Sequence, residues 1–353
     1  MTALRALSTG VLDDFVVPAR LEARSPAEER GIPRDAVRLM VADERGIAHR
    51  VFSDLDEILE PGDLLIVNNS ATLAASVVVD ETRAIHFSTR LPGGFYIVEP
   101  RLLSGPTSKP DHDVAPGLVR LPGGASVELL APYPADSSRA RLWLSRLELG
   151  GSSLLEYLAR WGRPIRYKHV DAPYPLESFQ TVFASVAGSA EMPSAGRPFS
   201  APLVARLAAA GIGVAPITLH TGVSSLESGE APYPEFMDVS ASTAALVNHT
   251  RGRGGRVIAV GTTVVRALES AVDTTGSAHP LRTWTDLVID STHETRVIDG
   301  LITGWHEPES THLSMLEAIA GRAILSESYA AALDSGYLWH EFGDSLLLMR
   351  ESQ

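Results

Sequence analysis

The sequence of 353 residues contains no cysteine, which excludes disulfide bonds, thiolate catalysis and cysteine-ligated metal sites. No apolar run approaches the roughly 20 residues that a membrane-spanning helix needs. The start lacks the basic and then apolar pattern of a signal peptide, and we find no internal repeat or low-complexity tract. These absences predict a soluble cytoplasmic enzyme.

Positive charge is also in short supply. The formal net charge of −13 opposes non-specific attraction to the phosphate backbone of a nucleic acid. One local basic cluster could still bind phosphates, and the alternative, a solvated helix end, stays open. The cluster consists of Arg160, Arg163, Arg166, Lys168 and His169.

The pattern of elements changes along the chain, which is long enough for two domains or for one domain with a large insertion. Residues 37–41 and 63–67 are strand-like. Between residues 71 and 149, short alternating runs are separated by Pro/Gly-rich turns, which is typical of a small antiparallel β-barrel. Its strands are expected at residues 76–79, 94–98, 125–130 and 140–144, and residues 103–113 are expected to form a mobile loop. From residue 153 onward, strands alternate with helices at residues 154–158, 202–209, 242–248 and 327–333, which indicates an α/β fold.

Residues 298–312 combine a strand-like run with a polar cluster. The apolar part ends in His306, Glu307, Glu309, Ser310 and Thr311, and residues 313–322 then show helical spacing with Ser310 or Thr311 as the expected N-cap. A strand that leads into a helix through polar residues is typical of the ligand-binding end of an open α/β sheet.

Two further junctions repeat this arrangement. Residues 256–261 form an apolar run that ends at Gly261, and Thr262 and Thr263 open an amphipathic helix whose free N–H groups could hold an anion or a ribose hydroxyl. Alternatively, Gly261 only turns the chain and a threonine only caps the helix. The third junction, residues 215–222, carries His220. Three strands with polar tips predict a shared crevice.

In this order, the motifs of the chain resemble those of S-adenosylmethionine:tRNA ribosyltransferase-isomerases, the enzymes of queuosine biosynthesis. The resemblance runs from about Arg34 to Leu348. Its segments are residues 34–39, 61–68, 179–184, 218–222, 260–269, 284–286, 299–303, 306–311, 336–337 and 343–344. The resemblance implies a discontinuous α/β domain, residues 1–70 and 150–353, with an inserted antiparallel β-barrel domain, residues 71–149, and a site between them.

The chain also departs from the family pattern. Ala71 and Ser76 stand where the family carries arginines, and Pro198 replaces a histidine. Residues 224–237, including the Ala231-Pro-Tyr-Pro segment, replace a stretch with two more histidines, and the residues before His306 differ as well. One half of the ligand site is therefore expected to be retained and the other altered.

The resemblance implies an unusual reaction. S-adenosylmethionine donates its ribosyl portion: a base removes a proton beside the sulfonium, the sugar rearranges, and adenine and methionine depart as an amine acceptor is alkylated. No metal is implied, because the sulfonium itself acidifies the C–H bond. The protein must supply a base, an acid for adenine and a dry, oriented pocket. His306 and His220 are the candidates for proton transfer, and substrate positioning or a structural hydrogen bond is the alternative for each.

Gly261, Thr262, Thr263 and Arg266 are the candidates for holding the hydroxyls or carboxylate of the donor, although Arg266 could instead pair only with Glu269 or Asp273 on its helix. Further candidate binding residues lie in family-like segments: Asp286, Asp299, Asp344, Ser310 and Thr311. Glu191 and Arg197, in the altered loop, are candidate specificity determinants, and an exposed loop charge is the alternative for Glu191.

Three functions remain open: a queuosine-pathway transferase that forms epoxyqueuosine on preQ1-tRNA, a paralogue that uses S-adenosylmethionine on a smaller acceptor or cleaves it, and a noncatalytic binding protein. The lost arginines and histidines predict weaker activity on preQ1-tRNA than a typical member shows. S-adenosylmethionine is expected as cosubstrate, without a metal. A tRNA is a candidate partner, a membrane is not, and a monomer is favoured although the oligomeric state is open.

Overall fold

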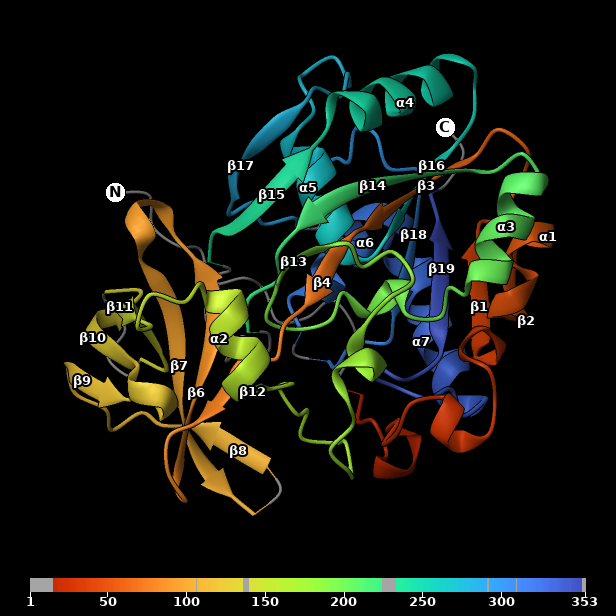
Figure 1. The fold of residues 1–353 in the computed structure, drawn as a ribbon. Coiled ribbons are helices and arrows are strands. Elements are labelled where there is room, and N and C mark those ends of the chain that lie inside the picture. Colours follow the sequence, from red (N-terminus) through yellow and green to blue (C-terminus); the bar gives the residue numbers. More distant parts are fainter. Residues whose placement is uncertain are drawn as a thin grey trace.

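The computed structural model describes residues 15–105, 107–135, 140–223, 233–290, 292–308 and 310–350. It has two large β-sheets flanked by helices, so the predicted mixed α/β class is confirmed (Figure 1). Glu309 and residues 224–232 of the altered segment lie outside the described residues.

A nine-stranded sheet forms the centre of the larger part of the molecule. In spatial order its strands are β17 (Leu281–Thr285), β15 (Glu235–Val239), β14 (Gly213–Leu219), β3 (Leu64–Asn68), β16 (Val257–Val260), β18 (Gly300–Gly304), β19 (Ser345–Met349), β1 (Arg38–Asp43) and β2 (Gly46–Val51). Strands β14, β3, β16 and β18 run parallel to one another, whereas β19 is antiparallel to β18. The central strands are buried at nearly every position, as the apolar runs predicted.

Alternate residues of these strands supply two separate cores. On β3, Leu64 and Ile66 belong to one hydrophobic cluster and Leu65 and Val67 to the other, because successive side chains of a strand point to opposite faces. The first cluster packs against α4 (Ala241–Gly252), α5 (Thr262–Ser270), α6 (His312–Ala320) and α7 (Arg322–Asp334). The second lies under α1 (Leu55–Ile58) and α3 (Ala201–Ala209).

The helices agree with the predicted ones, and three of them begin at serine N-caps. Serines 153, 200 and 240 accept a backbone N–H at the starts of α2 (Leu154–Trp161), α3 and α4. The helix expected over residues 313–322 ends at Ala320, because Gly321 has a φ of 76° and separates α6 from α7. Short 3-10 turns lie at Ala19–Leu21, Glu28–Arg30, Arg34–Ala36, Phe52–Asp54, Pro92–Gly94, Pro122–Gly124, Leu176–Phe179 and Ser194–Gly196. In the described part of the chain, no helix is long and apolar enough to span a membrane.

The second large sheet contains the strands expected between residues 71 and 149. It comprises β5 (Ser76–Val78), β6 (Arg83–Arg90), β7 (Tyr96–Ser104), β8 (Thr107–Pro110), β9 (Gly117–Arg120), β10 (Ser126–Tyr133), β11 (Leu142–Glu148) and β12 (Gly162–Arg163), all paired antiparallel. Its strand order begins at β12 and ends at β9, so closure into a barrel stays a prediction. The loop expected at residues 103–113 is wrong in part, because β8 pairs with the end of β7 as a hairpin.

The two sheets meet beside the predicted crevice. Trp284 of β17 donates a hydrogen bond from its indole to the carbonyl of Arg90 at the end of β6 (3.0 Å), and the Val223 amide donates to the Ser88 hydroxyl (3.0 Å). A two-stranded parallel pair, β4 (Ser70–Thr72) with β13 (Val186–Ser189), bridges the space between the sheets (Figure 1).

Candidate active site

The carboxyl ends of the four parallel strands meet at one edge of the large sheet. His220 follows β14, Asn68 ends β3, Gly261 follows β16 and His306 follows β18. This topology brings together the three junctions that the sequence singled out, as predicted for an open α/β sheet.

His220 is held by contacts on both sides of its ring. Its Nδ1 atom lies 2.8 Å from the Ser70 hydroxyl, and the ring stacks on Phe236 with 5.5 Å between centroids. A Cβ at position 188 would stand 2.4 Å from the imidazole, so Gly188 lets the backbone of β13 lie directly against the ring. Burial lowers the pKa of His220 to about 4, which leaves it neutral at physiological pH.

The start of α5 offers free backbone donors. Gly261 has a φ of 99°, which favours glycine, and its N-cap position provides no side-chain cap for the first turn. Thr262 is buried at this point, and Asn68 donates from Nδ2 to the Thr263 hydroxyl (3.3 Å). Asn68 also accepts the Ser70 and Leu219 amides on Oδ1, so it ties β3, β4 and β14 together.

Sequence reasoning missed Asn68 as a site residue. The available signal was an amide side chain at the end of an otherwise apolar strand, where an unpaired polar group would be costly.

Arg266 is half-buried, and each of its guanidinium nitrogens has a partner, but the acidic partner differs from those expected. Its guanidinium forms an ion pair with Glu235 of β15 and donates to the carbonyls of Leu287 (3.0 Å) and Thr285 (3.2 Å). The alternative pairings with Glu269 and Asp273 are therefore wrong. Glu235 in turn accepts the amide of Gly222, just after His220, so the pair braces two of the site segments.

His306 contacts two hydroxyl groups and the ring of a second histidine. Its Nε2 atom is 2.9 Å from the Thr303 hydroxyl, its backbone amide donates to the Tyr329 hydroxyl (3.2 Å), and its ring stacks on His312 at 4.6 Å. Burial, with smaller contributions from His312 and His340, places the pKa of His306 well below its usual value.

The neighbouring hydroxyls support this stack. Ser310 lies 2.9 Å from Nδ1 of His312, and burial together with the charge of Arg266 lowers the pKa of His312 to about 4. Thr311 occupies the N-cap position of α6, although its side chain makes no capping hydrogen bond. His312 was not among the expected site residues, and only its place in the polar segment pointed to it.

The three candidate aspartates lie in different places. Asp344 precedes β19 at this edge, where its carboxylate accepts the amides of Arg38 and Leu338 and pairs with the Arg38 guanidinium (3.0 Å). Asp286 follows β17 and is exposed. Asp299 directly precedes β18 and therefore lies at the opposite edge of the sheet. Its carboxylate accepts the Val257 amide (2.8 Å), and burial raises its pKa. The structure does not bring Asp299 together with the other candidates.

The altered loop passes across the crevice. The Ala190 amide donates to the Thr221 carbonyl (2.7 Å), the Thr221 hydroxyl donates to the Glu191 carbonyl (2.6 Å), and a Cβ at Gly261 would meet Ala195 at 3.4 Å. Glu191 is 8% exposed, so its interpretation as an exposed loop charge is wrong.

Arg197 is buried, and its guanidinium contacts residues that are not candidate site residues. It pairs with Glu28 (2.8 Å), donates to the Ser178 carbonyl and stacks over Phe342, which fixes the end of this loop to the N-terminal segment.

One group has the composition of a metal site within the described part of the chain. Ligand atoms of His169, His340 and Glu341 all lie within 4.8 Å of one another. The imidazoles stack at 4.1 Å with 18° between their planes, whereas a shared ion must lie in the plane of each ring that binds it. The 3.0 Å approach of His169 to Glu341 therefore fits a direct contact beside the His340 ring better than it fits a metal shared by both imidazoles.

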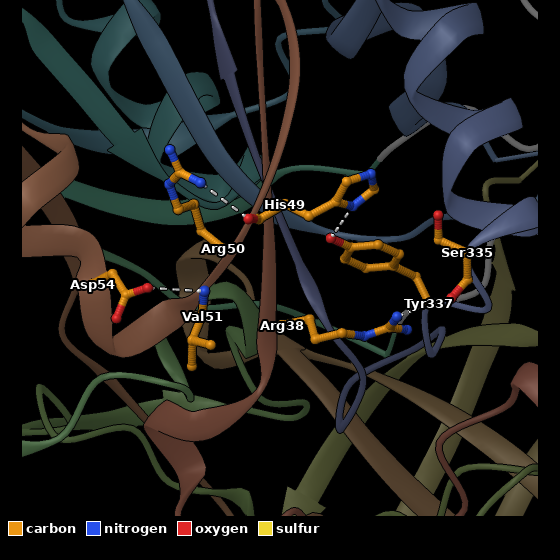
Figure 2. Close-up of a pocket in the computed structure, with 7 residues that line it drawn as sticks. All are labelled: Arg38, His49, Arg50, Val51, Asp54, Ser335 and Tyr337. Atoms are coloured by element: carbon orange, nitrogen blue, oxygen red, sulfur yellow. Dashed lines mark hydrogen bonds between the residues drawn. The ribbon is translucent and has the colours of Figure 1, made fainter.

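A surface pocket of about 470 Å³ lies elsewhere, at the outer end of the sheet around edge strand β2. Figure 2 shows its lining residues, including His49, whose Nδ1 atom is 2.9 Å from the Tyr337 hydroxyl. No predicted site residue lines it. Because the polar junctions converge at the strand ends and not here, we place the candidate active site at the carboxyl edge.

Comparison with known proteins agrees with the motifs. The family described as queuosine biosynthesis protein matches residues 13–348. S-adenosylmethionine:tRNA ribosyltransferase-isomerase of Acaryochloris marina is 33% identical over 96% of this chain and 93% of that protein. The enzyme of the same name from Symbiobacterium thermophilum is 34% identical over 95% of this chain and 98% of its own length.

A solved structure shares the fold. The crystal structure of S-adenosylmethionine tRNA ribosyltransferase from Thermotoga maritima is similar with a TM-score of 0.52 and 27% identity, over 95% of this chain and 99% of that one. The chain therefore belongs to the queuosine biosynthesis protein family of ribosyltransferase-isomerases.

Proposed function

We propose that this chain transfers the ribosyl portion of S-adenosylmethionine to an amine on a tRNA base, the reaction that forms epoxyqueuosine on preQ1-tRNA. The observation that carries the proposal is the meeting of His220, Gly261 and His306 at one sheet edge in a chain that matches the family over nearly its whole length.

The donor would bind at the start of α5. The uncapped N–H groups after Gly261, with the hydroxyls of Thr262 and Thr263, suit the carboxylate or ribose hydroxyls of S-adenosylmethionine. Arg266 would contribute by bracing this helix through Glu235, since its guanidinium is already occupied. Asp286, exposed at the same edge, would offer a carboxylate to the donor.

Neutral imidazoles suit a cationic donor. His220, His306 and His312 have lowered pKa values, chiefly through burial, so a sulfonium beside them meets no like charge. In this proposal His306 accepts a proton during the reaction and Ser310 holds His312 against it. The neighbouring second sheet would help to exclude water from the crevice.

The domain division proposed from the sequence is consistent with the strand pairing. Every strand of the nine-stranded sheet lies in residues 1–70 or 150–353, and the eight-stranded sheet draws only β12 from outside residues 71–149. We propose that residues 71–149 form the inserted barrel and that the acceptor approaches between the two parts.

The acceptor surface would include the end of α2 and strand β12. Arg160 lies over the ring of Trp161, which is 37% exposed, and exposed Arg163 pairs across β12–β5 with Ser76. Directly paired residues of antiparallel strands share a face. Arg163 thus returns a cation to the neighbourhood in which Ser76 replaces a family arginine, and Trp161 offers a ring on which a base could stack.

Product analysis with three acceptors tests this proposal. The protein is incubated with S-adenosylmethionine alone, with preQ1-tRNA, and with the free base or small amines, and adenine, methionine and the nucleoside are measured. We expect release that depends on preQ1-tRNA and yields epoxyqueuosine. Efficient turnover with a small amine, or with no acceptor, would instead establish the paralogue that the altered loop beside Gly261 favours. Binding without any release would establish the noncatalytic function.

A further inference from the structure

We infer that Ser70 and Ser189 are positioning residues that hold His220 in the tautomer protonated on Nε2, so that this imidazole serves as a hydrogen-bond donor and not as the base. The inference rests on the proposed function for its catalytic consequence only. The tautomer itself follows from contacts of the free protein.

The contacts form a chain of four groups. The Thr221 amide lies 3.1 Å from Ser189 Oγ, Ser189 Oγ lies 2.6 Å from Ser70 Oγ, and Ser70 Oγ lies 2.8 Å from Nδ1 of His220. Both serines are almost completely buried, with exposed fractions of 0% and 1%. Bulk solvent therefore does not reach the two hydroxyls, so we expect each of their hydrogens to have an acceptor among these four groups.

The direction of the chain follows from which atoms can donate. The Thr221 amide can only donate, so Ser189 Oγ accepts that hydrogen bond. The Ser189 hydroxyl must then donate a hydrogen bond to Ser70 Oγ. The Ser70 hydroxyl in turn donates a hydrogen bond to Nδ1 of His220. The reverse direction would leave the Ser189 hydrogen without an acceptor among the described residues, which is unfavourable for a buried hydroxyl.

A neutral imidazole that accepts on Nδ1 carries its hydrogen on Nε2. In the described part of the chain Nε2 has no protein partner, and Gly188 and Phe236 hold the ring on either side. The Nε2 hydrogen is therefore free for a substrate atom that gains negative charge, such as a ribose oxygen or a nitrogen of the departing adenine. A neutral histidine can act in this way as an electrophile. The proton-accepting role is then left to His306.

Nitrogen NMR of the free protein tests the tautomer without any turnover. Long-range ¹H–¹⁵N correlations, assigned through their loss in His220→Gln, should show Nδ1 unprotonated and Nε2 protonated across pH 6–8. Ser70→Ala removes the donor to Nδ1 and should produce a mixture of tautomers, whereas Ser70→Thr keeps the hydroxyl and should preserve the wild-type signals. A wild-type protein with its hydrogen on Nδ1 would overturn the inference.

Kinetics tests the catalytic consequence with matched variants. We expect Ser70→Ala to lower kcat about 10- to 100-fold while KM for S-adenosylmethionine stays within about threefold, and Ser70→Thr to recover most of the rate. Ser145→Ala is the control, because Ser145 is a fully buried serine of the second sheet whose hydroxyl donates to the Tyr96 carbonyl. An unchanged kcat in Ser70→Ala, with an altered tautomer, would refute the catalytic half. Absence of turnover in the wild type would refute the proposed function and leave the tautomer to be judged by NMR.

Discussion

At the scale of single residues, burial sets the chemistry of the candidate site. His220 and His306 follow strands and His312 begins α6, and in all three places desolvation disfavours the imidazolium, so all three are neutral at pH 7. Yet each has a different hydrogen-bond partner: Ser70 for His220, Thr303 for His306 and Ser310 for His312. Three histidines whose pKa values are all lowered can therefore have different roles.

Replacement of His306 by alanine should remove turnover and leave affinity for S-adenosylmethionine largely intact. A group that transfers a proton acts mainly in the transition state, and its loss typically lowers the rate by about 10² to 10⁴. Single-turnover kinetics and calorimetry measure the two quantities separately. His49→Ala, in the pocket around β2, is the control. Turnover within twofold of wild type would show that His306 is structural.

The same histidines predict how stability depends on pH. Their folded-state pKa values lie below the ordinary value of 6.5, so above that pH neither the folded nor the unfolded state binds their protons. As the pH falls from about 6.5 toward 4, the unfolded state is protonated first, and stability falls by up to about 1.4 kcal/mol per group and pH unit. Urea unfolding at pH 7, 6 and 5 should show this loss. His312→Gln should reduce the slope, and an unchanged slope would contradict the assignment of His312 as a neutral buried group.

At the scale of elements, strand ends and helix starts supply the groups, and pairing between strands decides which ones meet. Arg163 lies opposite Ser76 only because β12, which follows α2, returns to pair with β5. Likewise, β4 and β13 pair in parallel and so bring Ser70 beside Ser189, which is 119 positions away in the sequence.

Arg163→Ala should weaken binding of preQ1-tRNA and reduce its salt dependence, without altering affinity for S-adenosylmethionine. One lost phosphate contact reduces the slope of log K against log salt by about one unit. Electrophoretic mobility shifts at several salt concentrations measure the slope. Arg146→Ala provides a comparison, because Arg146 is an exposed arginine of the same sheet that pairs with Glu128. Equal effects of the two variants would indicate that only overall charge matters.

At the scale of the whole molecule, the candidate site lies where two sheets approach each other, beside the Ser88–Val223 and Arg90–Trp284 contacts. The residues proposed to hold S-adenosylmethionine come from the larger sheet, and Arg163 of the proposed acceptor surface comes from the smaller one. A ligand that contacts both sheets would hold them together and would be shielded from water between them.

The protein should bind S-adenosylmethionine with chelator present, because the groups proposed to hold the donor are backbone amides and hydroxyls at the start of α5. Calorimetry in EDTA tests this, and Gly261→Val is the matched variant: a β-branched residue at a φ of 99° should distort that turn and lower affinity. No heat at millimolar ligand would refute the prediction.

The sequence alone determined the local features of this protein. The apolar runs of the strands, the capping serines 153, 200 and 240, and the polar residues after β14, β16 and β18 are all signals between near neighbours in the chain. Such signals also carry the family motifs, so the α/β class and the family could be predicted.

Tertiary structure decided every contact between distant segments. It paired Arg266 with Glu235 rather than with an acidic residue of its own helix, buried Glu191, and put Asp299 at the opposite edge of the sheet from His306. It also joined Ser70 to His220 across 150 positions. Periodicity indicates which face of an element is buried but not which element covers it, and strand order, which only the packed sheet defines, determines which side chains meet.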